Sequence, residues 1–492
     1  MDNNYIYNYY FDKIIVKNEI PSFVDKLKYI KERTKLLNDN NNKYFGFAFL
    51  LDNMNVEKNI KLMKEEIKVM NDKIILKQNK LNSIFPWPPK IGLDKIGESC
   101  FMNATLQCFC QIEEFVLLFK YDKQIDEVID KYIQKNDNCL TKSFKNLIEK
   151  IWPDEAKQYE MNERHFPPDE FRKTIADMCP LFANNQANDA KDLVNFIIMN
   201  LHEELYESKE SKEDNNIMNQ MNICLNNNNN QSDILKSFYE EYKITFSSKI
   251  SELFYAIQQI QTRCLNCINI HYNFQGYFFV VFPLEEVRKY TINKISEVSF
   301  NNMNLNLIMN NGLNQKNNDF NFIPPIPLNN NLNPNSIKLN KLNNDIVNIM
   351  DCFEYNQKIE FFTGTNQIYC NKCKKMANAN NNTILTTAPK VLILLLNRGV
   401  GMQLKIKLEF TNELDITNYV TQKNGNIKYR LIGVITYLGE SGTGGHFIAH
   451  CLSPIDNEWY KYDDATVSKI DDFQKQIIEL GMPYLLFYKK FE

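Results

Sequence analysis

Length, composition and charge limit what the chain can be. It has 492 residues, a formal charge of −3 and 44% hydrophobic residues. This is enough for one unusually large domain or two to three ordinary ones. The nearly balanced charge argues against a global basic field, so we expect neither nucleic acid nor an anionic membrane as a partner.

The sequence contains no recognisable targeting or membrane segment. Its N-terminus has neither the basic region nor the apolar run of a signal peptide, and the longest apolar run, residues 391–396, is too short to span a bilayer. The 12 cysteines should therefore be reduced, and we expect the protein in the cytoplasm, the nucleus or both.

Residues 1–84 are predicted to form a separate, partly helical N-terminal region. Apolar residues recur at helical spacing over residues 21–37 and again over the lysine-rich residues 56–81. The second segment is more consistent with a helix packed on its own chain than with one that docks on a partner. The pattern does not predict a function for this region.

A cysteine then follows a turn-forming segment and opens an apolar run. The run from Cys100 to Phe119 has helical spacing, and Gly97 permits a tight turn just before it. A thiol at a helix start faces the positive end of the helix dipole, which favours the nucleophilic thiolate. A buried structural thiol is the alternative interpretation of Cys100 taken alone.

The remaining elements change from helical to strand-rich along the chain. Helices are predicted over residues 144–152, 169–178 and 188–205, and strands over 277–282, 391–396, 429–437, 446–452, 458–462 and 484–488. This order indicates an α+β enzyme with a cleft between its lobes. The asparagine run 226–230 and the Asn/Pro-rich segment 301–344 are predicted to be a surface loop and a disordered insert.

A histidine far downstream supplies a base for Cys100. His446 follows Gly444 and Gly445, two residues that would let a substrate tail approach closely, and it opens a predicted strand. A turn then returns the chain to Asp463, whose carboxylate could fix the imidazole tautomer. The adjacent Asp464 is the alternative, and the spacing slightly favours Asp463.

These segments resemble the ubiquitin-specific proteases. The motif Gly-Leu-x-Asn-x-Gly-x-x-Cys-Phe/Tyr-Met-Asn-x-x-Leu-Gln is met from Gly92 to Gln107 with one exception, Gly445-His446-Phe447 and residues 459–467 match the histidine box, and residues 188–193 and 483–488 match two further elements. The resemblance covers residues 88–490 and implies a papain-like cysteine protease fold, with a helical thumb, a β-rich palm and zinc-bearing fingers. It implies hydrolysis after the C-terminal glycine of ubiquitin, with ubiquitin and ubiquitinated proteins as partners.

The resemblance also implies roles for individual residues. Cys100 would be the nucleophile, His446 the base and then acid, and Asp463 the residue that orients it. Asp189, with Gly444 and Gly445, would lie near the channel that receives the ubiquitin tail.

The exception in the cysteine box is Lys95. The family pattern has asparagine there, and its amide donates to the tetrahedral oxyanion, an interaction worth ~3 kcal/mol. Lysine is longer and more flexible, and Glu98 could disfavour the thiolate if it pointed inward, although a solvated turn residue is the more ordinary interpretation. A catalytically weak ubiquitin-binding scaffold is therefore the second hypothesis, and a general papain-like peptidase is the third.

Two Cys-x-x-Cys pairs predict a metal site. Cys264/Cys267 and Cys370/Cys373 have the spacing of zinc knuckles, and two such pairs favour a four-thiolate site over free thiols or disulfides. Four thiolates close the coordination shell, so the zinc would be structural. A nucleic-acid-binding ribbon is the alternative, but no basic stripe accompanies the pairs.

Overall fold

The computed structural model describes residues 90–135, 137–153, 164–184, 186–206, 231–294, 346–422, 425–439, 445–479 and 481–491. All of them belong to one of two compact units, Leu81–Glu492, and the other unit is Met1–Lys80. The predictions for residues 1–84, 226–230 and 301–344 lie outside the described residues. No helix within these described ranges is long and apolar enough to cross a membrane.

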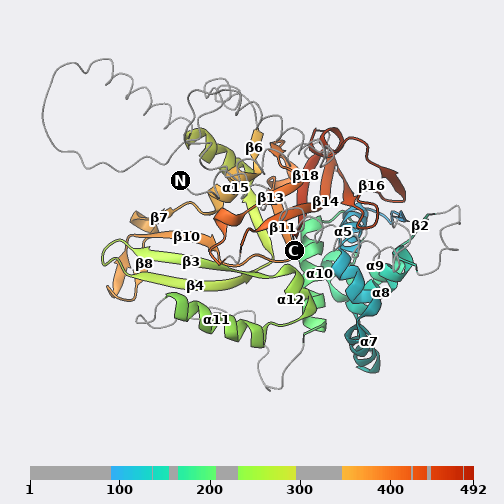
Figure 1. Ribbon diagram of the computed structural model, residues 1–492, viewed down its shortest axis with the longest axis horizontal. Helices are drawn as coiled ribbons and strands as arrows, with labels where there is room; N and C mark the ends of the chain where they lie inside the picture. The colour runs from blue at the N-terminus through green and yellow to red at the C-terminus, as the bar shows by residue number, and fades with distance from the viewer. Residues whose placement is uncertain are drawn as a thin grey trace, which may run out of the picture. The chain divides into compact units, whose positions relative to one another are not determined.

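The first part of this unit is helical (Figure 1). Its α-helices are α5 (Cys100–Cys110), α6 (Glu113–Tyr121), α7 (Lys123–Lys135), α8 (Leu140–Ile151), α9 (Asp169–Met178) and α10 (Ala190–Glu204). The prediction of one helix from Cys100 to Phe119 is wrong, because the buried Ile112 takes an extended conformation (φ −81°, ψ 106°). That break lets α5 and α6 each turn an apolar face into the core, although the apolar spacing continues across both.

An eight-stranded sheet packs against these helices. Its order is β17-β16-β15-β14-β18-β11-β5, with β13 beside β14. The strands are β5 (Phe279–Pro283), β11 (Val391–Asn397), β13 (Glu413–Asp415), β14 (Lys428–Gly439), β15 (Gly445–Leu452), β16 (Trp459–Asp463), β17 (Thr466–Lys469) and β18 (Met482–Lys490).

Both faces of the central strands are buried. On β11, Ile393 and Leu395 join the core under the helices, whereas Leu392 and Leu394 join a second core on the opposite face. Because strand side chains alternate between faces, a strand buried on both sides reads as a continuous apolar run. The second core packs under the helix over residues 284–294 and under α15 (Ile349–Asn356).

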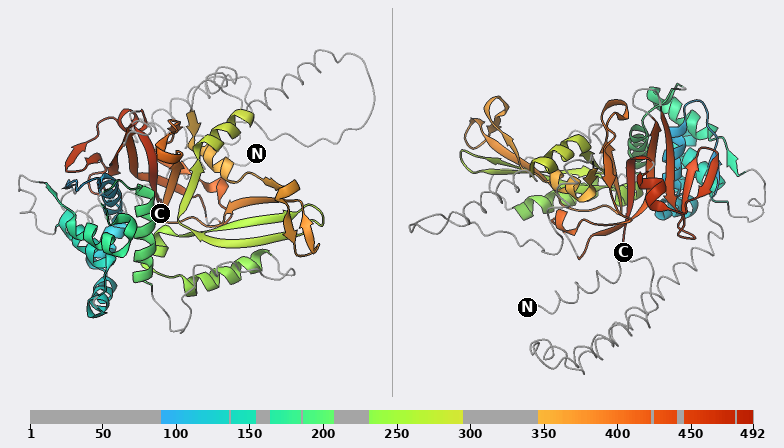
Figure 2. Two further views of the ribbon diagram at one scale, coloured as in Figure 1. Left: turned by 180° about the vertical axis from the view of Figure 1, so that it is seen from behind. Right: turned by 90° about the horizontal axis from the view of Figure 1, so that it is seen from above.

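A second, four-stranded sheet extends to one side of the eight-stranded sheet (Figures 1 and 2). Its order is β4-β3-β10-β7, formed by β3 (Ala256–Cys264), β4 (Ile270–Tyr277), β10 (Ala379–Leu385) and β7 (Glu360–Phe362). Helix α11 (Gln231–Thr245) lies along β4, where Phe238 packs on Phe274 with ring centroids 5.8 Å apart. Most of this sheet was not predicted, since β3 and β10 are rich in Gln and Asn, which have low strand propensity.

The fold class is confirmed as α+β, with a helical thumb, a β-rich palm and β-rich fingers that end in a four-cysteine cluster. A hairpin of β8 (Ile368–Cys370) and β9 (Lys375–Ala377) forms one side of the fingertip. Smaller elements complete the unit: β1 (Gly92–Leu93), β2 (His165–Phe166), α12 (Lys249–Phe254), β6 (Ile346–Asn348) and β12 (Lys407–Glu409).

Candidate active site

Cys100 is the first residue of α5 and only 2% of it is exposed. The preceding turn passes through Gly97 at φ 62°, a left-handed conformation that glycine adopts without steric cost. Ser99 Oγ accepts from the Ile96 N–H at 2.8 Å and does not cap the helix with its side chain. The first-turn N–H groups therefore lack a side-chain cap and can stabilise negative charge at or near the sulfur.

Asn103, one turn further along α5, fixes the helix against the chain on either side of the site. Its Nδ2 donates to the carbonyls of Leu93 (3.1 Å) and Asp94 (3.2 Å) and to Asp464 Oδ1 (2.8 Å). No role for Asn103 was predicted from the sequence. Its position three residues after Cys100 was the available signal, because residues three apart on a helix share a face.

Strands β15 and β16 bring the histidine and the carboxylate together. His446 is the second residue of β15 and Asp463 the last of β16, and the two strands pair antiparallel. His446 Nε2 lies 2.7 Å from Asp463 Oδ1, whereas Asp464 Oδ2 is 3.9 Å away. Asp464 has left the strand, with φ 50°, and its side chain bonds Asn103 instead.

The interactions of His446 favour its charged form. A hydrogen bond with the Cys100 sulfur is the largest influence, and together with the Asp463 hydrogen bond it outweighs burial and raises the pKa of His446 to about 9. Burial would raise the pKa of Asp463, but the hydrogen bonds from His446 and Lys461 hold it below its usual value. With Nε2 held by Asp463, the other ring nitrogen is left for the sulfur.

Lys95 lies beside this constellation and forms an ion pair. Its Nζ is 3.2 Å from Glu98 Oε2, and the two side chains are 38% and 55% exposed. Burial alone would lower the pKa of Lys95, but the Glu98 hydrogen bond and the charges of Glu98, Cys100 and Asp464 raise it. Glu98 therefore faces solvent and Lys95, which agrees with the solvated-turn interpretation.

Of the two predicted substrate-channel glycines, Gly445 is the first residue of β15 and Gly444 lies outside the described residues. A Cβ added at Gly445 would lie 2.0 Å from Cζ of Tyr437. Any side chain there would have to displace a packed aromatic ring, so the strand requires glycine at this position.

Asp189 caps α10 rather than standing free. Its Oδ1 accepts from the Lys191 N–H at 3.0 Å, and its Oδ2 accepts from Lys191 Nζ (2.7 Å) and from the Tyr484 hydroxyl (2.9 Å). Tyr484 comes from β18, so this carboxylate joins a thumb helix to the palm sheet.

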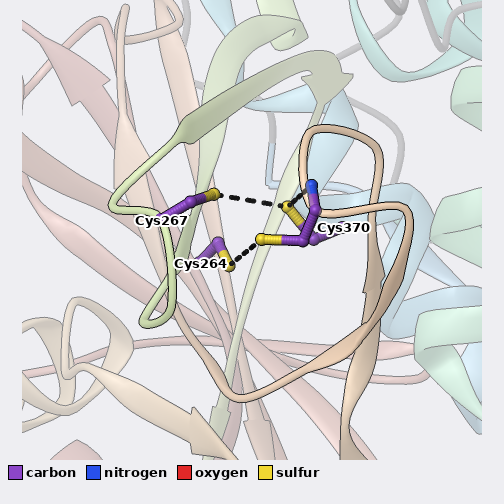
Figure 3. Close-up of side chains that lie close together, drawn as sticks. Cys264, Cys267 and Cys370 are labelled. Atoms are coloured by element: carbon purple, nitrogen blue, oxygen red, sulfur yellow. Dashed lines mark hydrogen bonds between the residues drawn. The ribbon is translucent and has the colours of Figure 1, made fainter.

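The two Cys-x-x-Cys pairs meet at the fingertip (Figure 3). Cys264 Sγ lies 3.8 Å from Cys373 Sγ, Cys267 Sγ lies 3.7 Å from Cys370 Sγ, and all four sulfurs lie within 4.8 Å of one another. Disulfide sulfurs would be about 2.05 Å apart. Four sulfurs placed tetrahedrally 2.3 Å from a zinc ion are about 3.8 Å apart, so the cluster fits zinc.

The backbone around each Cys-x-x-Cys pair also favours metal binding. The residue after each pair, Ile268 and Lys374, has positive φ (58° and 55°), which turns the chain back over the sulfurs. The Cys373 N–H donates to Cys370 Sγ at 3.4 Å, and the N–H of Cys267 is the main reason that the pKa of Cys264 falls to about 6. Donors of this kind stabilise thiolate, the form that binds metal.

An α+β scaffold that places a cysteine at a helix start, with a histidine and an aspartate on adjacent strands, defines the class of papain-like thiol hydrolases. Comparison with known proteins identifies the family within this class. Residues 91–488 match the family described as ubiquitin carboxyl-terminal hydrolase, and the chain belongs to that family, the ubiquitin-specific proteases.

Individual relatives are distant. Ubiquitin carboxyl-terminal hydrolase 2 of Bos taurus is 22% identical over 410 residues, which cover 81% of this chain and 54% of that protein. Ubiquitin carboxyl-terminal hydrolase 48 of Rattus norvegicus is 31% identical over 136 residues, covering 26% of this chain and 13% of that protein. The matched part of this chain therefore spans about half the length of ubiquitin carboxyl-terminal hydrolase 2 of Bos taurus and of Homo sapiens.

A solved structure shares the fold. The SAGA DUB module Ubp8/Sgf11/Sus1/Sgf73 bound to monoubiquitin matches with a TM-score of 0.50 at 16% sequence identity, covering 86% of this chain and 76% of that one.

Proposed function

We propose that residues 88–490 form the catalytic domain of a deubiquitinating thiol protease that hydrolyses the peptide or isopeptide bond after the C-terminal glycine of ubiquitin. The observation that carries this proposal is that His446 bonds Asp463 at 2.7 Å and also forms a hydrogen bond with the Cys100 side chain. Family membership supports the substrate class.

The chemistry uses the charged form of His446 that these interactions favour. The Cys100 thiolate attacks the glycine carbonyl carbon, a C–S bond forms, and the carbonyl electron pair moves to oxygen. The His446 imidazolium then protonates the leaving amine as the C–N bond breaks and a thioester remains. Water, deprotonated by His446, next attacks the thioester and releases the carboxylate and the thiolate.

The surrounding residues position these groups. Asp463 holds the orientation of the His446 imidazole, and the Cys100 N–H donates to the oxyanion. Asn103 holds α5 against β1, the strand that precedes the turn. Gly445 gives the narrow backbone approach that a Gly-Gly tail needs, and Asp189 stabilises the adjacent thumb–palm junction. Zinc, when bound by Cys264, Cys267, Cys370 and Cys373, would supply a structural cross-link between the two sides of the fingers.

A second candidate function rests on the Lys95–Glu98 ion pair. If Lys95 stays with Glu98, the oxyanion receives one donor fewer than the family pattern supplies, and the chain is a weak enzyme that binds ubiquitin. Replacing Lys95 with asparagine distinguishes the active protease from the weak, ubiquitin-binding scaffold. An increase in hydrolysis of more than about tenfold would favour the scaffold function, since one such donor is worth about 10²–10³ in kcat.

The proposal is tested with ubiquitin that carries a C-terminal electrophile. We expect this probe to label the protein, the Cys100→Ala variant to lose the label, and the Cys179→Ala variant, at a half-buried cysteine outside the site, to keep it. Absence of labelling of folded, zinc-loaded protein would overturn the proposal. Cleavage of unfolded casein without cleavage of a ubiquitin-derived substrate would indicate a general peptidase instead.

A further inference from the structure

The fingertip carries an exposed surface that the catalytic mechanism does not use. It is formed by residues of the two cysteine knuckles, and we call it the fingertip surface. Its exposed members are Arg263, Leu265, Ile268, Tyr369, Lys372, Lys374, Lys375 and Met376, of which Lys375 faces the opposite side of the β8–β9 hairpin from Tyr369 and Met376.

Part of the fingertip surface is apolar and open to solvent. Leu265, Ile268, Tyr369 and Met376 are 38%, 53%, 56% and 53% exposed. Tyr369 and Met376 are direct cross-strand partners in the β8–β9 hairpin, so both side chains lie on the same face. Large apolar side chains gathered in this way on a small projecting tip indicate an interaction site.

Ile268 is unfavourable in two independent ways. Its φ of 58° is in the left-handed region, where a β-branched side chain is strained and glycine would cost less. Its side chain is also more than half exposed, so it gains little from burial within this chain. A partner that covers the side chain would offset both costs.

The rest of the fingertip surface is positively charged. The expectation that no basic stripe accompanies the cysteine pairs is wrong: residues 263–269 and 368–378 contain four cations, Arg263, Lys372, Lys374 and Lys375, and no Asp or Glu. All four cations are exposed, and none forms an ion pair with a residue in the described parts of the chain. A zinc ion with four thiolates carries −2, so the tip retains a surplus of about two positive charges, although the whole chain is acidic.

We propose that the fingertip surface binds an acidic segment of a protein partner that also carries large apolar side chains. Charge complementarity selects an acidic partner and would steer its approach. The exposed aliphatic side chains of Leu265, Ile268 and Met376 favour a protein, because they gain free energy by burial against apolar groups and a phosphate backbone offers none. This inference does not depend on the proposed hydrolase activity.

Fluorescence anisotropy with the full-length, zinc-loaded protein tests the proposal. The probe is a labelled synthetic peptide that alternates Glu with Leu and Phe, and the comparison probes are a Glu/Ser peptide, a Lys/Leu/Phe peptide and a single-stranded oligonucleotide. We expect the acidic apolar peptide to bind most tightly, and its affinity to fall as salt is raised because the contacts are solvent-exposed.

Two sets of variants separate charge from packing. Reversing Lys372 and Lys374 to Glu should weaken binding by at least about tenfold, and Tyr369→Ser with Met376→Ser by a similar factor. Lys405→Glu with Lys407→Glu, at exposed lysines beside and on β12, is the matched charge control and should leave binding unchanged. Bound zinc measured for each variant verifies that the knuckles remain folded.

Three outcomes would overturn the proposal. They are no binding of the acidic apolar peptide to the parent protein, unchanged binding by the fingertip variants, and tighter binding of the oligonucleotide with displacement of the peptide. The last result would assign the fingertip surface to nucleic acid.

Discussion

At the scale of single residues, His446 connects the nucleophile to the carboxylate. The choice between two adjacent aspartates is made by backbone conformation. Asp463 ends β16 with its carboxylate 2.7 Å from the imidazole, whereas the positive φ of Asp464 turns that residue toward Asn103. Strand alternation does not decide between them, because β16 ends at Asp463 and Asp464 already lies in the turn.

The raised pKa of His446 predicts a pH profile. Because this pKa rises from 6.5 to about 9, the imidazolium persists through neutral pH and is lost as pH passes about 9. Hydrolysis of a ubiquitin C-terminal amide should therefore show a descending limb in kcat/KM near pH 9. Asp463→Asn removes an interaction that raises this pKa, so the limb should move to lower pH. A limb that stays in place in this variant would show that Asp463 does not act through His446.

At the scale of elements, the thumb is held together by a buried carboxylate. Glu204, the last residue of α10, accepts from the N–H groups of Leu140 (2.8 Å) and Thr141 (2.7 Å) at the start of α8. It therefore satisfies two of the N–H groups that a helix start leaves unpaired. Burial, the largest influence, raises the pKa of Glu204 despite these hydrogen bonds.

Loss of one acceptor at this junction should destabilise the thumb. Glu204→Gln keeps one side-chain oxygen and turns an amide donor toward the second N–H, so we expect the free energy of unfolding to fall by about 1–3 kcal/mol. Urea denaturation measures the change. Glu203→Gln, at the exposed neighbouring residue, is the matched control and should change stability by less than about 0.5 kcal/mol. Equal effects of the two variants would contradict the capping role.

At the scale of the whole molecule, the four-cysteine cluster joins segments more than a hundred residues apart. Cys264 and Cys267 end the β3 side of the fingers, and Cys370 and Cys373 belong to the β8–β9 side. No disulfide links the cysteines within the described chain, so a metal is the cross-link that these sulfurs fit.

Removal of this cross-link should be measurable as a loss of stability. We expect about one zinc per chain by elemental analysis. In Cys373→Ser, zinc should fall to near zero and Tm should fall by several degrees, because metal binding free energy contributes to folding. Cys179→Ser, outside the cluster, should keep both the zinc and the Tm. Two results would contradict the structural role of zinc. One is a parent protein that contains no zinc, and the other is a Tm that does not change when the zinc is removed by a chelator.

Several elements can be predicted from strong local signals in the sequence. The buried strand at residues 391–396, the helix start at Cys100 and the two zinc-knuckle spacings are encoded by neighbouring residues, and the α+β class follows from their order. The polar strands β3 and β10 were missed because their stability comes from pairing with each other, along seven residues of register, rather than from their own propensity.

The assembly of the site, in contrast, depends on tertiary packing. Lys95 is paired with Glu98, Asn103 bridges three acceptors on two segments, and Asp463 rather than Asp464 bonds His446. Each of these facts depends on the φ of one turn residue or on strands that meet over long sequence separations. Local sequence sets residue chemistry and helix starts, whereas distances between side chains are set by packing of the complete core.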